Sequence, residues 1–264
     1  MTTFLRTLCA AVALALAFAS PARAADPDYS DIWWAAGGTE AGWGVNFAHS
    51  PGFVFATFFI YGADGKPTWI TAELIQTGAG RYSGAVYTFT GTYFGLPWVP
   101  GNHGFVQAGD AQFVAESVVR GQLTYTVNGI QVVKTIARQA LTPIDVGGVY
   151  LGGMLIKNSA QCNGGANTTP YAYQLLVTEK AASTVEIAQV SLQGATDCIM
   201  EGLMVQTGRV RTMTGGTYTC GNTESAVSIT DMRRTSNGGI ELAWVADLGE
   251  GCTETGTFSG VPQQ

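Results

Sequence analysis

Histidine, charge and long apolar runs are all scarce in this chain of 264 residues. It has two histidines, and 12% of its residues are charged. Both histidines, His49 and His103, lie in the first half, so the second half has no Ser-His-Asp or Cys-His site of its own. The basic residues form no cluster, which argues against a nucleic-acid partner. After the N-terminus no segment has about 18 uninterrupted apolar residues, so we expect no membrane-spanning helix.

Sequence patterns for metal and cofactor binding are also lacking. No pair of cysteines is spaced C-x-x-C, and no glycine-rich phosphate loop joins a strand to a helix. The one local cluster of carboxylates is Asp26, Asp28 and Asp31, which we interpret as a solvated N-terminal tail. His49 and His103 each lie at a turn or loop, where we expect exposed side chains. We therefore predict no metal site and no cofactor.

The first 24 residues have the pattern of a secretory signal peptide. Arg6 precedes an apolar run, and Ala22-Arg23-Ala24 is a small-x-small cleavage site. Cleavage at Ala24 removes two of the 13 basic residues, which leaves 11 basic against 19 acidic residues and a net charge of −8. We expect a protein that is exported through a cleaved signal peptide to the periplasm or the cell exterior.

The remaining composition is typical of a turn-rich all-β protein, with 35 glycines and 11% aromatic residues. We predict two antiparallel β domains, each a barrel or a sandwich, with essentially no helix after the signal peptide. Pro143-Ile144-Asp145 reads as the linker, so the domains span 25–142 and 146–262. The four cysteines that remain after cleavage all lie in the second domain.

Turn signals divide the first domain into short strands. Phe53–Tyr61 is apolar at nearly every position, so we expect a central strand that is covered on both faces. Asn128-Gly129 lies between two β-rich segments, which predicts a tight hairpin turn. The expected strands are 42–48, 53–61, 67–75, 81–89, 103–115, 121–127 and 130–141.

The register of the Asn128-Gly129 hairpin brings two cations onto its apolar face. With a two-residue turn, Leu123 lies opposite Lys134, and Arg138 follows on the same face. A buried cation needs a partner or a path to water. Glu40 and Glu73 are the candidate partners. Two alternatives remain open: a buried ion cluster of Glu40, Lys134 and Arg138, or cations that reach solvent at a barrel rim.

The first domain resembles a module of exported bacterial proteins whose function is unassigned. The resemblance rests on the segments WW…EAGWGVNFAH…FVFATFFIYGADGKPTW, then G-x-Y-S-G-x-x-Y, then LTYTVNG…KTIARQ, over residues 30 to 141. Members of that family usually have Glu-Ser-Gly-Trp-Gly where this chain has Ala41 after Glu40. The resemblance implies a β fold and export, but it supplies no chemistry. The second domain resembles no family that we recognise.

Eight short strands fill the second domain and favour a barrel or a sandwich. They are expected at 148–157, 171–178, 184–193, 198–206, 210–220, 225–233, 239–246 and 253–260. The export route is oxidising, so the four cysteines predict two disulfides. Four cysteines allow three pairings. If the sheet closes, its first and last strands become neighbours, which favours Cys162–Cys252 together with Cys198–Cys220.

Aromatic residues of the first domain are the strongest binding signal. They either fill the barrel interior or bind a sugar or an apolar ligand near a barrel mouth. The ligand-binding candidates are Trp33, Trp34, Trp43, Trp69, Phe94 and Trp98. Our leading hypothesis is a non-catalytic exported protein that binds a carbohydrate or a small apolar ligand. The alternatives are a hydrolase that acts through carboxylates such as Glu40 and Glu73, and a structural or envelope-interaction module.

Overall fold

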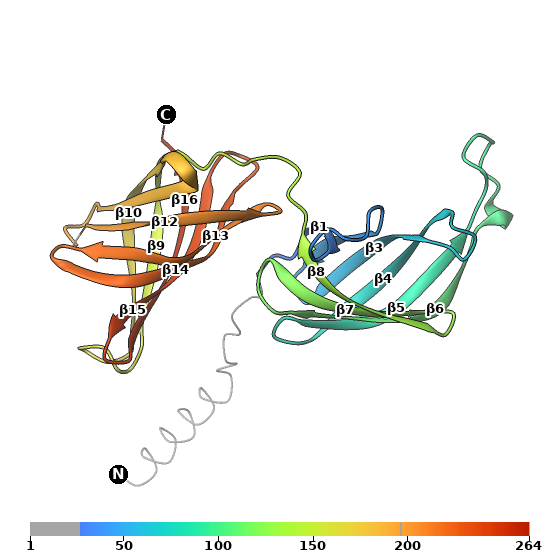
Figure 1. Cartoon of the computed structure of the whole chain (residues 1–264), viewed down its shortest axis with the longest axis horizontal. Coiled ribbons are helices and arrows are strands. Elements are labelled where there is room, and N and C mark those ends of the chain that lie inside the picture. Colours follow the sequence, from blue (N-terminus) through green and yellow to red (C-terminus); the bar gives the residue numbers. More distant parts are fainter. Residues whose placement is uncertain (1–26, 196, 264) are drawn as a thin grey trace, which may run out of the picture.

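The protein consists of two closed antiparallel β barrels, each with eight strands, joined by a short connection (Figure 1). This computed structural model describes residues 27–195 and 197–263. The signal peptide expected at residues 1–24, together with Asp26, lies outside these ranges. The all-β prediction is therefore confirmed, and barrels rather than sandwiches form in both halves. No helix in the described part of the chain is long and apolar enough to cross a membrane.

Each barrel is a meander in which sequential strands pair and the last strand returns to the first. The first barrel contains β1 (Asp31–Ala35), β2 (Gly44–Ser50), β3 (Phe53–Tyr61), β4 (Pro67–Gly78), β5 (Arg81–Thr90), β6 (Gly104–Ala115), β7 (Arg120–Val127) and β8 (Ile130–Arg138). The second contains β9 (Gly148–Asn158), β10 (Asn167–Glu179), β11 (Thr184–Ser191), β12 (Cys198–Thr207), β13 (Val210–Cys220), β14 (Thr223–Arg234), β15 (Ile240–Gly249) and β16 (Cys252–Pro262). Two short 3-10 helices, Pro100–Asn102 and Ala181–Ser183, lie in loops.

Strand β1 closes the first barrel, and the sequence did not reveal it. Its residues Trp33 and Ala35 pair with Arg138 and Ile136 of β8, while its other edge pairs with β2. Asp31 is the first residue of β1 and points inward with Trp33. The interpretation of the acidic run as a solvated tail is therefore wrong for Asp31.

Buried and exposed side chains alternate along the strands, so one face of each strand packs in the barrel interior and the other faces outward. In β3, Val54, Ala56 and Phe58 are fully buried, while Phe55 and Phe59 are exposed on the outer face. The expectation that Phe53–Tyr61 is covered on both faces is therefore wrong. A single barrel has only one interior, and in the described chain no second layer covers β3. The apolar outer residues of β3 face solvent.

Two disulfides bind the second barrel at one rim. Cys162, which follows β9, is bonded to Cys252 at the start of β16, and their Cα atoms are 4.5 Å apart. Cys198 and Cys220 pair directly across β12 and β13 and are also bonded. These are the two pairs that closure of the sheet predicts. The first of them lies beside the β16–β9 seam, so it reinforces the place where the barrel closes.

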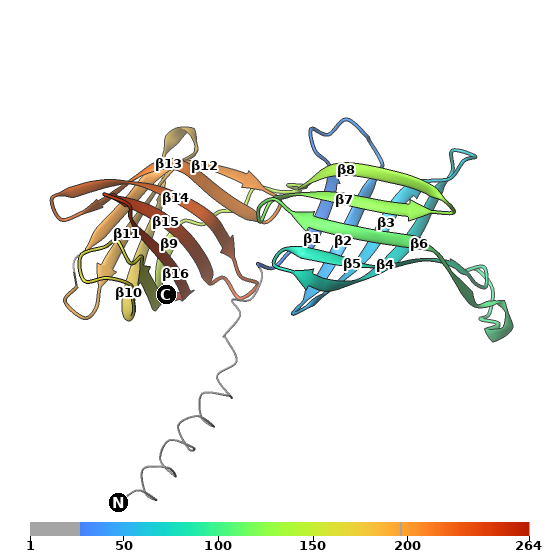
Figure 2. The same ribbon diagram turned by 90° about the horizontal axis from the view of Figure 1, so that it is seen from below.

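The two barrels meet at the β12–β13 hairpin, which reaches the end of the first barrel in Figure 2. One oxygen of Asp31, Oδ2, accepts hydrogen bonds from Nη1 of Arg138 at 3.1 Å and from the backbone N–H of Arg209 at 3.0 Å. A Cβ on Gly208 would lie 2.5 Å from Cβ of Arg138, so only glycine permits this approach. An ion pair between Asp28 and Arg233, 3.5 Å apart, also links the two barrels.

The Asn128-Gly129 turn provides a test of the first barrel. Both residues have positive φ, 49° and 81°, and the strand register is the one that the sequence predicts. A Cβ on Gly129 would meet nothing within 4 Å, so the cost of Gly129→Val comes from the backbone alone. We expect a loss of about 1–3 kcal/mol in the free energy of unfolding, measured by denaturant titration.

Gly101→Val is the matched control, because a Cβ on Gly101 also meets nothing within 4 Å and its φ is not positive. We expect this control to stay within about 0.5 kcal/mol of the parent. Equal losses in the two variants would contradict the assigned turn.

Candidate functional site

A cavity of about 590 Å³ lies at one mouth of the first barrel. Its volume is in the range of small-molecule sites, roughly 300–1,000 Å³. Strands β3, β4, β5, β7 and β8 and the loop before β2 contribute its walls. The lining is mostly apolar, and among the described residues Lys134 and Glu40 are its only charged groups. The lining residues used below are Glu40, Trp43, Ile60, Ile70, Tyr125, Val132 and Lys134.

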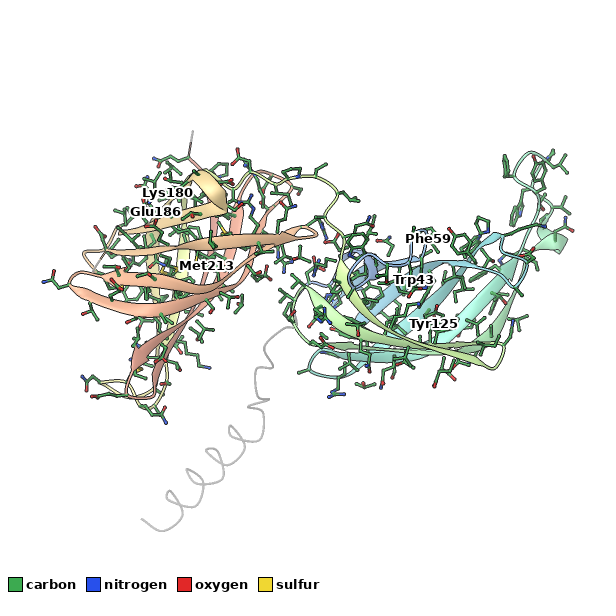
Figure 3. All side chains as sticks on the ribbon, viewed as in Figure 1. Trp43, Phe59, Tyr125, Lys180, Glu186 and Met213 are labelled. Carbon is green, nitrogen blue, oxygen red and sulfur yellow. A yellow bond between two sulfur atoms is a disulfide. The ribbon has the colours of Figure 1, made fainter. Side chains whose placement is uncertain are left out.

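Trp43 forms the buried side of this cavity because its loop approaches the barrel closely. Gly42 has a φ of +87°, and a Cβ there would lie 1.8 Å from the hydroxyl of Tyr61. The indole Nε1 of Trp43 donates a hydrogen bond to Oη of Tyr125 at 3.0 Å. Burial raises the pKa of Tyr125, so its hydroxyl stays protonated. Figure 3 labels both residues on the first barrel.

Lys134 and Glu40 form an ion pair at the edge of the mouth. Nζ of Lys134 lies 2.7 Å from Oε1 of Glu40 and 5.1 Å from the centre of the Trp43 ring. The side chains of Lys134 and Glu40 are 16% and 46% exposed, so the carboxylate is in contact with water. This pair corresponds to the rim alternative, because the cation reaches solvent along an apolar wall.

Arg138 is buried and has a different partner. Its side chain is 1% exposed and pairs with Asp31, whose side chain is 7% exposed. The guanidinium also donates to the backbone carbonyls of Val118 at 2.7 Å and Ser30 at 3.0 Å, and it lies 5.0 Å from the centre of the Trp33 ring. Burial lowers the pKa of Arg138, and Asp31 opposes that shift.

The predicted cluster of Glu40, Lys134 and Arg138 is thus two separate pairs. Glu40 binds Lys134 at the mouth, and Asp31 binds Arg138 near the junction with the second barrel. The placement of both cations on the inward face of β8 was right. The choice of Glu40 as the partner of Arg138 was wrong, because the strand that carries Asp31 was not recognised.

The six aromatic candidates do not form one site. Trp33 is fully buried in the core, and Trp43 lines the mouth. Trp34 and Trp69 are exposed on the outer face. Phe94 and Trp98 lie in the exposed loop between β5 and β6. Tyr125 completes the mouth, and it was not among the candidates although the hairpin register places it on the apolar face.

An aromatic strip crosses the outer face of four neighbouring strands of the first barrel. Phe59 pairs with Trp69 across β3 and β4, and Phe89 pairs with Phe105 across β5 and β6. The rings of Trp69 and Phe89 are stacked, with centroids 5.2 Å apart and an angle of 16° between their planes. One face of each of these two rings is therefore covered by the other ring. We call Phe59, Trp69, Phe89 and Phe105 the aromatic strip.

His49 is not an exposed turn histidine, as the sequence suggested. Its side chain is 7% exposed. Nδ1 lies 3.3 Å from the backbone N of Tyr29 and 3.6 Å from the carboxylate of Asp28, and Nε2 is hydrogen-bonded to Oη of Tyr82 at 3.0 Å. These contacts lie within the end of the barrel, so we interpret His49 as a structural residue. His103 is exposed, as expected.

The paired carboxylates of the hydrolase alternative do not converge. Glu73 is exposed on the outer face of β4, whereas Glu40 lies at the mouth. Glycoside hydrolysis needs two carboxyl groups within about 10 Å on either side of one bond. Within residues 27–195 and 197–263, no group of three His, Cys, Asp or Glu side chains could hold a metal ion.

Comparison of the chain with protein-family models found no match. A search of curated proteins also found no match. The fold defines a protein of two closed eight-stranded antiparallel barrels. The resemblance of residues 30 to 141 to an exported bacterial module stays a prediction.

The two ion pairs are expected to contribute very different amounts to the free energy of unfolding. Asp31→Asn leaves Arg138 buried without its counter-charge, so we expect a loss of about 3–5 kcal/mol in the free energy of unfolding. Glu40→Gln removes the partner of a cation that reaches water, and we expect a loss below about 1 kcal/mol. Denaturant titration of the two variants measures both. A larger loss in Glu40→Gln than in Asp31→Asn would contradict this assignment.

Proposed function

We propose that the first barrel binds a small, largely apolar molecule at its mouth. The observation that carries this proposal is the cavity of about 590 Å³, which has a mostly apolar lining and a single ion pair at its edge. Apolar pockets with a few fixed polar groups are the usual form of small-molecule sites. Export, as the N-terminal sequence indicates, fits a protein that captures such a molecule outside the cytoplasm.

The lining favours an apolar ligand over a carbohydrate. Sugars stack on open faces of aromatic rings, but the ring of Trp43 is buried and Lys134 lies over it. Ile60, Ile70 and Val132 offer aliphatic surface instead. A ligand with an apolar body in the cavity and a polar group at the Lys134–Glu40 edge satisfies both parts of the site.

Neighbouring valines on β8 allow a matched test. Val132 lines the mouth, while Val133 is exposed on the outer face. Val132→Trp fills the cavity, so we expect at least about a tenfold weaker affinity for the neutral fluorescent probe N-phenyl-1-naphthylamine. Val133→Trp should leave the affinity unchanged. Fluorescence titration measures both.

Failure of the parent protein to bind the probe, or equal affinity of the two variants, would contradict the proposal. Far-ultraviolet circular dichroism of each variant controls for the fold.

A second candidate function is contact with a lipid surface through the loop between β5 and β6. The segment 91–103 contains no Asp, Glu, Lys or Arg and projects from the barrel (Figure 1). Phe94 is 92% exposed, and Tyr93, Leu96 and Trp98 are exposed beside it. Uncharged loops rich in Trp, Tyr and Phe suit the membrane interface, where an amphipathic ring meets both lipid and water.

The aromatic strip extends this apolar surface onto the barrel. Ring contacts continue from Trp98 to His103 at 6.1 Å and from His103 to Phe105 at 6.5 Å. Patches of this kind on a soluble domain usually mark an interaction site. The chain carries a net negative charge, so we infer that contact would depend on apolar insertion and not on anionic lipid.

The lipid candidate is tested with vesicles of zwitterionic phosphatidylcholine in a co-sedimentation assay. Phe94→Ser with Trp98→Ser should reduce the bound fraction at least about fivefold, because each substitution removes an inserted ring. Ile75→Ser is the control, since Ile75 is 64% exposed but lies toward the other end of β4. Equal binding by the parent and the double variant would contradict this function.

A further inference from the structure

The second barrel has its own cavity, of about 490 Å³, at the rim that carries the disulfides. Three tyrosines line it, Tyr171, Tyr173 and Tyr218, together with aliphatic residues such as Ile156 and Leu248. The disulfide between Cys198 and Cys220 forms part of its wall. The same disulfide holds β12 and β13 together at this point. The rings of Tyr171 and Tyr173 meet edge to face, with centroids 5.9 Å apart.

A carboxylate faces this cavity. Glu254 points inward from β16, and its Oε1 accepts hydrogen bonds from Oη of Tyr218 at 3.1 Å and from Nε1 of Trp244 at 3.3 Å. Burial and the neighbouring Glu254 raise the pKa of Tyr218, so its hydroxyl stays protonated and donates. Among the described residues that line the cavity, Glu254 is the only charged one.

One nitrogen of a buried amide next to Tyr218 lacks a hydrogen-bond partner within the described chain. Gln189 is 1% exposed, and its Oε1 lies 3.4 Å from Oη of Tyr218. Its Nε2 has no hydrogen-bond partner within the described chain. Exchange of the amide oxygen and nitrogen would let the N–H donate to Tyr218 but would leave the oxygen alone. An unpaired buried polar group costs about 1–3 kcal/mol. Gln189 is not one of the residues that line the cavity, so its amide is a feature of the barrel interior next to the site.

We propose that this cavity is a binding site for a small organic amine in its ammonium form. A carboxylate without a cationic partner in the described lining and the faces of three tyrosine rings are the two features that attract an ammonium group. No basic side chain in the described lining opposes it. The apolar part of the ligand lies against Ile156 and Leu248. This site does not depend on the mouth of the first barrel.

The test uses the whole mature protein with both disulfides intact. Isothermal titration calorimetry with phenethylammonium chloride measures binding, and 2-phenylethanol, a neutral analogue of the same shape, is the comparison ligand. We expect the ammonium compound to bind at least about tenfold more tightly than the alcohol. No binding of phenethylammonium up to about 10 mM, or equal binding of the two compounds, would overturn the proposal.

Two carboxylate variants distinguish binding at this site from a general attraction by the net charge of the protein. Glu254→Gln should weaken phenethylammonium binding at least about tenfold, because it removes the charge and keeps the shape. Glu241→Gln removes the same charge from an exposed position on the neighbouring strand β15 and should leave the affinity within about twofold. Equal effects of the two variants would show that the net charge, and not this site, attracts the cation, which would overturn the proposal.

If Glu254→Gln fails to fold, Tyr171→Leu takes its place. Tyr171 is half-buried and lines the cavity, and leucine keeps an apolar side chain while it removes the ring face. We expect at least about threefold weaker binding of phenethylammonium and an unchanged affinity for 2-phenylethanol. An unchanged affinity for the ammonium compound would overturn the role of the tyrosine rings.

Discussion

Closure of each sheet into a barrel is the constraint on which the other features depend. The seams β1–β8 and β16–β9 leave neither sheet with a free edge, and every second residue of a strand must then face a single interior. This rule buries Phe58 and Val54 and leaves Phe59 outside. It also turns Lys134 and Arg138 inward on β8, at positions where an unpaired cation is costly.

The protein accommodates those two cations in different ways, and the difference follows from depth. Lys134 lies near the mouth, so water and Glu40 share its charge, and the same pair forms the polar edge of the cavity. Arg138 is too deep for solvent. Asp31 neutralises it, and the same carboxylate oxygen binds the backbone of Arg209 in the second barrel. A charge that closure forces inward thereby helps to join the two barrels.

The sequence predicted elements that carry a local signal. Asn128-Gly129 and the alternation beside it gave the hairpin register, and the spacing of turns gave all eight strands of the second barrel. Barrel closure then led to the pairs Cys162–Cys252 and Cys198–Cys220. Features that depend on distant contacts were missed. Strand β1 is only five residues long and begins with an acid that is buried only because Arg138 lies beside it. Neither Tyr218 nor Glu254 has a sequence pattern that marks it, because their contact joins the distant strands β13 and β16.

The central claim is that the first barrel takes an apolar ligand at its mouth, above a filled core. Each of the six tryptophans has a different position relative to this claim. Trp43 lines the mouth, and Trp33 is buried below it. The others lie elsewhere, with Trp34, Trp69 and Trp98 on the outside and Trp244 in the second barrel. The most direct measurement is the fluorine NMR spectrum of the protein labelled with 5-fluorotryptophan, titrated with N-phenyl-1-naphthylamine. The account predicts a saturable shift of the Trp43 resonance while the Trp244 and Trp98 resonances stay in place. A shift confined to Trp69 or Trp98, with Trp43 unchanged, would contradict it.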